Sequence, residues 1–371
     1  ISPLDSRATT LRATTNLLEL YGLFNHLTIY PFKMKKLLLI LLCFPIIGFG
    51  QNVYIPDANF KAYLVGNTAI NTNGDNEIQV SEANAFNGNI GCSWNNIADL
   101  SGIEHFISVT GISCGNNQLS SVDLSNNTDL THIWFGSNQL TSLDLSNNIF
   151  LTEISIENNQ LSSLDFTNNT ILQTLYCSQN QITSLDVSNN ILLNNLYFGN
   201  NMLSSINLSN NINLNSLLCD SNQISNLNLT NNYSLNYLQC NYNQLTSLDL
   251  SSNTNLEVLG CSYNQIGSIN LSQNNLLVAL FCNNNQLLSL DLSGLSCSLQ
   301  INESDYSENP NLNCIEVTDL SCWQNYIGLL DTTYQYYSTN CNTTIIQEHT
   351  TNKELLKVTD LLGRETKQTN Q

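Results

Sequence analysis

The side chains that could perform acid–base chemistry in this 371-residue chain include a column of six aspartates spaced by 21 residues or multiples of 21. A catalytic carboxylate pair is a local feature of one site, whereas this column runs along the middle of the chain. Asparagine takes the same position at Asn207, Asn228 and Asn270. The pattern therefore favours a solvated face over a catalytic pair. The aspartates of the column are Asp123, Asp144, Asp165, Asp186, Asp249 and Asp291.

Other catalytic signals are missing from the sequence. His105 and His132 have no obvious partners, and His349 lies near the end of the chain. We find no G-x-S-x-G, H-E-x-x-H or phosphate-loop motif. We therefore predict that the chain is not an enzyme and that it needs no cofactor, with calcium as the one candidate.

That candidate is the loop 71–82, in which oxygen-bearing side chains alternate along the chain. The loop resembles a 12-residue EF-hand calcium loop, with oxygen ligands at positions 1, 3, 5 and 12 and isoleucine at position 8. It departs from that pattern at Asn71, where aspartate is usual, and at Asn76, where glycine is usual. A calcium site and a metal-free turn both stay open. The candidate ligands are Asn71, Asn73, Asp75, Glu77 and Glu82.

Charge is distributed very unevenly, and the formal net charge is −19. All ten lysines and arginines lie at or before Lys61 or at or after Lys353, while 23 aspartates and glutamates lie between them. Nucleic-acid binding needs basic side chains to displace counterions, so we expect no nucleic-acid partner. Salt bridges to lysine or arginine cannot form within the basic-free stretch.

The element that positions these residues is an internal repeat. Nine asparagines follow one another at intervals of 21 residues without one insertion. Positions +2, +5, +7, +13, +16 and +18 from the first eight are apolar or cysteine, and a second asparagine follows ten residues after each of these eight. An amide carries both a donor and an acceptor, so we predict that these asparagines satisfy backbone groups at bends. The nine are Asn117, Asn138, Asn159, Asn180, Asn201, Asn222, Asn243, Asn264 and Asn285.

The repeat over 93–293 resembles the nested 21-residue class of bacterial leucine-rich repeats. This resemblance implies a β-rich solenoid, a right-handed coil of about 9–10 turns. Because the L-x-L alternation occurs twice per turn and has the period of a strand, we expect parallel sheets on both faces. Residues 51–92 would form a small helix-containing N-terminal cap, and 294–341 a C-terminal cap.

Cysteines recur three residues before several of the repeat asparagines, at Cys114, Cys177, Cys219, Cys240, Cys261 and Cys282. Phe135, Ile156 and Phe198 take the same place in other units. A row along the solenoid axis does not converge on a metal, so we interpret these cysteines as small buried hydrophobic residues.

Four further cysteines lie in the C-terminal cap, and they suggest two disulfides with three possible pairings. Resemblance to the end caps of similar secreted proteins favours Cys314 with Cys341, which leaves Cys297 for Cys322.

The start of the chain resembles an export signal. Met34 is followed by two lysines and by the apolar run 37–49, which is too short to span a bilayer and is interrupted by Pro45. We assign 34–50 as a signal peptide and 1–33 as upstream sequence that is not translated. We therefore expect a secreted or cell-surface protein with no transmembrane helix in its mature form.

The end of the chain, 342–371, is polar and differs from the repeat. Residues 352–366 resemble the start of the C-terminal sorting domain of the bacterial type IX secretion system, through a short strand followed by Asp-x-Leu-Gly-Arg. The type IX secretion machinery is therefore an expected partner.

A recognition face is the main functional hypothesis. Residues that flank the inward positions of the first strand should point outward, and there the repeat loses its consensus and becomes rich in aromatic residues. Aromatic residues that vary on a constant scaffold suit binding of an extracellular protein or glycan. The competing interpretation is that large residues merely cover the sheet. The candidate ligand-binding residues are Trp134, Tyr176, Tyr197, Tyr237, Tyr242, Tyr263 and Phe281.

A structural, adhesive or ice-binding solenoid is the alternative. The second half of each turn presents regular columns such as Ser142, Asp144 and Ser146. Ordered-water templates rely on uncharged threonine rows, so the aspartate column argues against ice binding, and a thermal-hysteresis assay would decide.

Overall fold

The computed structural model describes residues 51–295, 304–323 and 335–341. The predicted upstream extension, signal peptide and sorting-domain start lie outside these residues, as do Cys297 and the side chain of Cys322. The chain divides into two compact units. In the described part of the first unit, Asn52 pairs with Gln79 in an isolated antiparallel bridge. The second unit holds the repeats.

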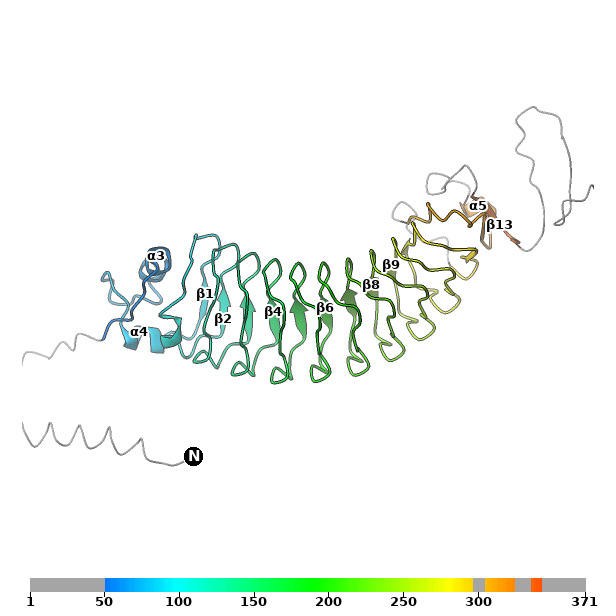
Figure 1. Ribbon diagram of the computed structural model, residues 1–371. Coiled ribbons are helices and arrows are strands. Elements are labelled where there is room, and N and C mark those ends of the chain that lie inside the picture. The colour runs from blue at the N-terminus through cyan, green and yellow to red at the C-terminus, as the bar shows by residue number, and fades with distance from the viewer. Residues whose placement is uncertain (1–50, 296–303, 324–334, 342–371) are drawn as a thin grey trace, which may run out of the picture. The chain divides into compact units, whose positions relative to one another are not determined.

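Ten short parallel strands, one per turn of the chain, form a single sheet in sequence order (Figure 1). Ile133 lies beside Ile154 in the register, and Ile154 beside Leu175. This arrangement confirms the predicted parallel solenoid with 21-residue turns. Another turn follows the tenth strand, where Phe281 bridges to Asp305. The strands are β1 (Asn89–Gly91), β2 (Gly111–Ser113), β3 (His132–Trp134), β4 (Glu153–Ser155), β5 (Thr174–Tyr176), β6 (Asn195–Tyr197), β7 (Ser216–Leu218), β8 (Tyr237–Gln239), β9 (Val258–Gly260) and β10 (Ala279–Phe281).

The core consists of the side chains that each turn directs inward. In the turn that contains β3, Ile133, Phe135 and Leu140 are fully buried and Leu145 is 2% exposed. Side chains alternate across a strand, so the residues that flank Ile133 point outward. Each buried aliphatic side chain contributes about 1.5–3 kcal/mol, and a turn buries them only when its neighbours are stacked on it.

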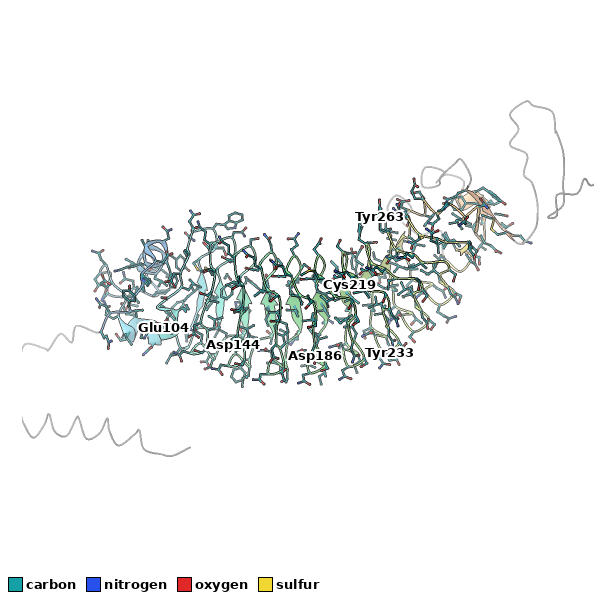
Figure 2. All side chains as sticks on the ribbon, in the orientation of Figure 1. Glu104, Asp144, Asp186, Cys219, Tyr233 and Tyr263 are labelled. Atoms are coloured by element: carbon teal, nitrogen blue, oxygen red, sulfur yellow. A yellow bond between two sulfur atoms is a disulfide. The ribbon has the colours of Figure 1, made fainter. Side chains whose placement is uncertain are left out.

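The cysteine column lies inside this core. The described free cysteines are all buried, and burial raises the pKa of the Cys261 thiol to about 12. Figure 2 shows Cys219 within the stack of turns. Cys92 adds a position to the column that the sequence did not reveal, and its sulfur lies 2.9 Å from that of Cys114.

The repeat asparagines link each turn to the one before it. Asn201 Nδ2 donates to the carbonyl oxygens of Cys177 at 3.0 Å and Phe198 at 2.9 Å. Its Oδ1 accepts from the N–H of Ile182 at 3.0 Å. The same set of bonds recurs along the solenoid, and Asn309 adds a position beyond the nine predicted from the sequence by accepting from the N–H of Leu287 at 3.1 Å.

The opposite face differs from expectation. A three-stranded parallel sheet is present there at the C-terminal end, formed by β11 (Leu290–Asp291), β12 (Cys314–Glu316) and β13 (Tyr336–Ser338). The described turns before it have no second sheet, so the prediction of sheets on both faces is correct only for this end.

Side chains replace backbone pairing in the other turns, which is the physical reason for the difference. The second asparagine of each turn links adjacent turns, as Asn211 does by donating from Nδ2 to the carbonyl oxygens of Val187 and Asn190 at 3.0 Å each. In the preceding bend a side chain accepts the N–H two residues later, as Asp144 does from Ser146 at 2.9 Å. The same bend bond is present in β11, where Asp291 accepts from the N–H of Ser293 at 2.8 Å, so it does not distinguish the two arrangements. The turn of β11 differs by having Leu295 where the other turns have the second asparagine.

Short helices form the caps. Asp57 begins α3 (Ala58–Gly66) because its carboxylate accepts from the N–H groups of Asn59 and Phe60 at 2.9 Å each. The N-terminal region also contains α4 (Val80–Ala85) and η2 (Ile103–His105). No helix among the described residues is long and apolar enough to cross a membrane.

The C-terminal cap contains α5 (Leu320–Trp323) and the disulfide between Cys314 and Cys341. That pairing confirms the one favoured by the resemblance.

The first prediction concerns the asparagines that link the turns. Asn201→Leu should lower the free energy of unfolding by about 1–3 kcal/mol, because one buried N–H and two carbonyl oxygens lose a partner. Urea unfolding measures the effect. Asp144→Asn is the control and should leave the midpoint unchanged, since Asn207 already makes the equivalent bond to the N–H of Ser209. Equal midpoints for the two variants would contradict the assigned role.

The second prediction concerns Asn211, whose Oδ1 accepts no hydrogen bond. It distinguishes the cost of losing the hydrogen-bond donors of this side chain from the cost of burying a charge in its place. Asn211→Leu should cost about 1–3 kcal/mol, because two carbonyl oxygens lose their donor. Asn211→Asp should cost more at pH 7, because it also buries a carboxylate against those carbonyls.

Burial would raise the pKa of the new carboxyl in the folded state. The extra loss should therefore be present at pH 7 and should shrink at pH 5, as protonation removes the charge. Urea midpoints at the two pH values, each compared with wild type, test this. Aspartate and leucine variants of equal stability at pH 7 would contradict it.

Candidate functional site

The outward face of the ten-stranded sheet carries one row of residues from the third position of each strand. Parallel register places them side by side across adjacent turns. We call this line the aromatic row. Its members from β2 to β10 are Ser113, Trp134, Ser155, Tyr176, Tyr197, Leu218, Gln239, Gly260 and Phe281.

A shallow hollow of about 460 Å³ lies over β3 to β7. Ser155 lies between Trp134 and Tyr176 in the row, and its small side chain leaves the space that larger neighbours surround. The rings of Tyr176 and Tyr197 meet edge to face with centroids 4.8 Å apart. We call this site the acidic aromatic hollow. Its lining is Trp134, Glu153, Ser155, Glu157, Tyr176, Ser178, Tyr197 and Leu218.

Two carboxylates give the hollow its charge. Glu153 accepts from Trp134 Nε1 at 3.0 Å, and Glu157 accepts from the hydroxyl of Ser155 at 2.6 Å. Burial raises the pKa of Tyr176, and the charges of Tyr197, Glu153 and Glu157 raise it further. Because no lysine or arginine lies between 62 and 352, the hollow is a region of negative potential beside exposed aromatic rings.

A glycine gives Glu157 its place. A Cβ at position 136 would lie 2.2 Å from Glu157 Oε1, so the carboxylate rests where any other residue would put a side chain. This relation joins two adjacent turns. It was not visible in the sequence.

The remaining candidates lie outside the hollow. Tyr242 and Tyr263 stack with centroids 4.2 Å apart and rings 10° from parallel, and they are 53% and 43% exposed. Both have φ of 54°, a left-handed conformation that bulky residues seldom adopt. A side-chain hydrogen bond with Tyr263 raises the pKa of Tyr242. Figure 2 labels Tyr263 at the edge of the stack of turns.

The last two candidates, Tyr237 and Phe281, are partly exposed. The hydroxyl of Tyr237 accepts from Gln239 Nε2 at 3.1 Å. Phe281 ends the aromatic row, separated from Tyr197 by Leu218, Gln239 and Gly260. The structure therefore gathers Trp134, Tyr176 and Tyr197 at one site and does not gather all seven candidates.

Sequence reasoning missed a strip of exposed apolar residues in the bends that follow the second asparagine of each turn. Apolar residues directly after that asparagine were the available signal. The strip comprises Ile149, Phe150, Ile171, Ile191, Leu192, Ile212, Tyr233 and Leu276.

The loop 71–82 is closed by its own hydrogen bonds. Glu82 Oε1 accepts from the N–H groups of Thr72 at 2.8 Å and Asn73 at 3.2 Å, and Glu77 pairs with Lys61 at 2.6 Å. Nδ2 of Asn71 donates to the carbonyl oxygen of Asp75 at 2.7 Å. No group of three or more acidic, histidine or cysteine side chains is poised for a metal in the described part of the chain. Calcium binding by this loop stays a hypothesis.

The calcium hypothesis expects millimolar Ca²⁺ to raise the melting temperature, because a ligand bound only by the folded state stabilises it. Glu82→Gln should abolish that rise. Magnesium at the same concentration is the control for ionic strength. A rise that persists in Glu82→Gln would place the effect at the aspartate column, and no rise in wild type would leave the loop a plain turn.

Solved structures with this architecture are leucine-rich repeat proteins. The functional domain of InlJ from Listeria monocytogenes, which includes a cysteine ladder, is 27% identical over 77% of this chain and 70% of its own, with a TM-score of 0.57. Internalin C2 from the same organism is 22% identical over 54% of this chain and 91% of its own, with a TM-score of 0.51. A TDR receptor is 20% identical over 64% of this chain and 45% of its own, with a TM-score of 0.56.

No protein-family model and no curated protein sequence matches the chain. Its turns, strand register and buried cysteine column give it the fold of the leucine-rich repeat solenoids of bacterial internalins.

Proposed function

We propose that the chain is an exported, non-enzymatic recognition protein that binds an extracellular protein or glycan on the outward face of its ten-stranded sheet. The acidic aromatic hollow is the observation that carries this proposal. Its rings are held on a rigid sheet, and Trp134 remains 41% exposed. Rigid aromatic side chains on a packed scaffold are the residues that most often anchor binding partners. Sharing a fold with internalins and a receptor agrees with such a role.

Export rests on the sequence of the two ends. The apolar segment after Met34 and the Asp-x-Leu-Gly-Arg motif near the end support secretion through the type IX machinery to the cell surface or the medium.

The opposite face has a hollow of similar size, about 470 Å³. A structural, adhesive or ice-binding solenoid would use that face, but the hollow there is weaker support for a function than the acidic aromatic hollow. Ser142, Asp144, Ser163 and Asp165 are among its lining residues. Their columns repeat from turn to turn, and their carboxylates are used by the local bends. The residues that line the acidic aromatic hollow, in contrast, do not form columns that repeat from turn to turn.

The test is an array of glycans and surface proteins probed with wild type and with Trp134→Ala/Tyr197→Ala. Both side chains point outward, so the double variant should fold normally. Loss of each anchor should weaken binding by about 1–2 kcal/mol, or roughly tenfold.

Phe150→Ala/Tyr233→Ala removes two aromatic rings from the exposed apolar strip and serves as the matched control. A ligand that both double variants hold as well as wild type would overturn the proposal. A ligand lost only by the control would place the site on the strip.

A further inference from the structure

The two carboxylates of the acidic aromatic hollow have no lysine or arginine in the repeat to balance them. Glu153 uses Oε1 for Trp134, and Glu157 uses Oε2 for Ser155. An ionised carboxylate has about four lone-pair positions, so each retains capacity to accept from a ligand. Both are half-buried, which strengthens their interaction with a charge brought into the hollow.

The lack of a side chain at Gly136 is what allows Glu157 to take its position. A side chain there would occupy the place of the Glu157 carboxylate. The chain thus has the residue that allows an acidic group to lie against the sheet beside Trp134, Tyr176 and Tyr197.

Aromatic rings around a carboxylate pair favour a cation. The face of a tryptophan or tyrosine ring attracts an ammonium or guanidinium group, most strongly where water is partly excluded. A neutral sugar could stack on the same rings and donate hydroxyl hydrogen bonds to the carboxylates, but it would bring no positive charge to balance them. The net charge of −19 would also draw a basic partner toward this protein from a distance.

From these contacts we infer that the acidic aromatic hollow binds a lysine or arginine side chain presented by a protein partner. The inference rests on the proposed function and narrows it to a protein with an exposed basic residue. The guanidinium or ammonium group lies between the carboxylates of Glu153 and Glu157 and contacts the rings of Trp134 and Tyr197.

Short peptides test the inference directly. The probes are Gly-Gly-Arg-Gly-Gly, the same peptide with lysine, and the same peptide with citrulline, which keeps the shape of arginine without its charge. Binding is measured by calorimetry at pH 8. Arginine and lysine peptides should bind about tenfold more tightly than the citrulline peptide.

Three variants locate the effect. Glu153→Gln/Glu157→Gln should abolish the preference for the charged peptides, whereas Asp144→Asn/Asp165→Asn, with the same change of net charge on the other face, should retain it. Gly136→Ala keeps every charge and displaces only the flexible end of Glu157, so it should weaken binding several-fold without lowering the melting temperature. An unchanged preference in Glu153→Gln/Glu157→Gln, or an equal loss in both double variants, would overturn the inference.

A partner found on the array separates this inference from the proposed function. One outcome is that the partner binds Glu153→Gln/Glu157→Gln normally but no longer binds Trp134→Ala/Tyr197→Ala. That outcome would support the recognition face and refute the binding of a lysine or arginine side chain. A neutral glycan bound in that manner would have the same meaning. Binding that neither variant loses would remove the recognition face itself, whatever the peptides do.

Discussion

The turns from β2 to the one that contains Asn309 each depend on one carboxamide at the first bend. In each case the asparagine donates to a carbonyl oxygen of its own turn and to one of the turn before, and it accepts an N–H from the earlier turn, as Asn201 does with Phe198, Cys177 and Ile182. Aspartate lacks the donors and leucine lacks both functions. The nine asparagines follow one another without a single extra residue. Asn309 makes the same three bonds 24 residues after Asn285, so the bonds tolerate a longer turn at that end.

A scaffold fixed in this way leaves the outward positions free to vary. The aromatic row shows how few residues are needed to make a site. The small side chain of Ser155 leaves room between its larger neighbours, and Gly136 has no Cβ to exclude the Glu157 carboxylate. Neither residue disturbs the buried Ile154 or Phe135 beneath. The rings that surround the space are held by the sheet, so a ligand would not have to order them on binding.

The period of the repeat was sufficient to predict the strands, the inward residues and the parallel register, because each follows from local alternation and from stacking identical turns. It could not reveal whether the second half of each turn would pair as a sheet. Leu143-Asp144-Leu145 and Leu290-Asp291-Leu292 have the same pattern, yet only the second contains a strand. Asp144 and Asp291 accept the same N–H of the bend, so this bond does not decide the outcome. The two turns differ ten residues after the first asparagine, where Asn148 links adjacent turns and Leu295 cannot.

The site was predictable only in part, since the outward direction of Trp134 follows from the repeat. The contact of Glu157 with the space above Gly136 depends on side-chain geometry between turns.

The carboxylates of the two faces illustrate the difference between a structural and a functional charge. Hydrogen bonds from the following serine or threonine lower the pKa values of Asp144, Asp165, Asp186 and Asp249. For Asp144 these bonds outweigh the repulsion from Asp123 and Asp165 in the adjacent turns. A column of like charges is therefore tolerated, because each charge is already used by its own bend.

Glu153 and Glu157 belong to no such column. Their positions are taken by Thr174 and Ser178 in the next turn, so neither charge is required by the repeat. A charge that the fold does not need, placed beside aromatic rings in a repeat without lysine or arginine to pair with it, is available for a ligand from outside.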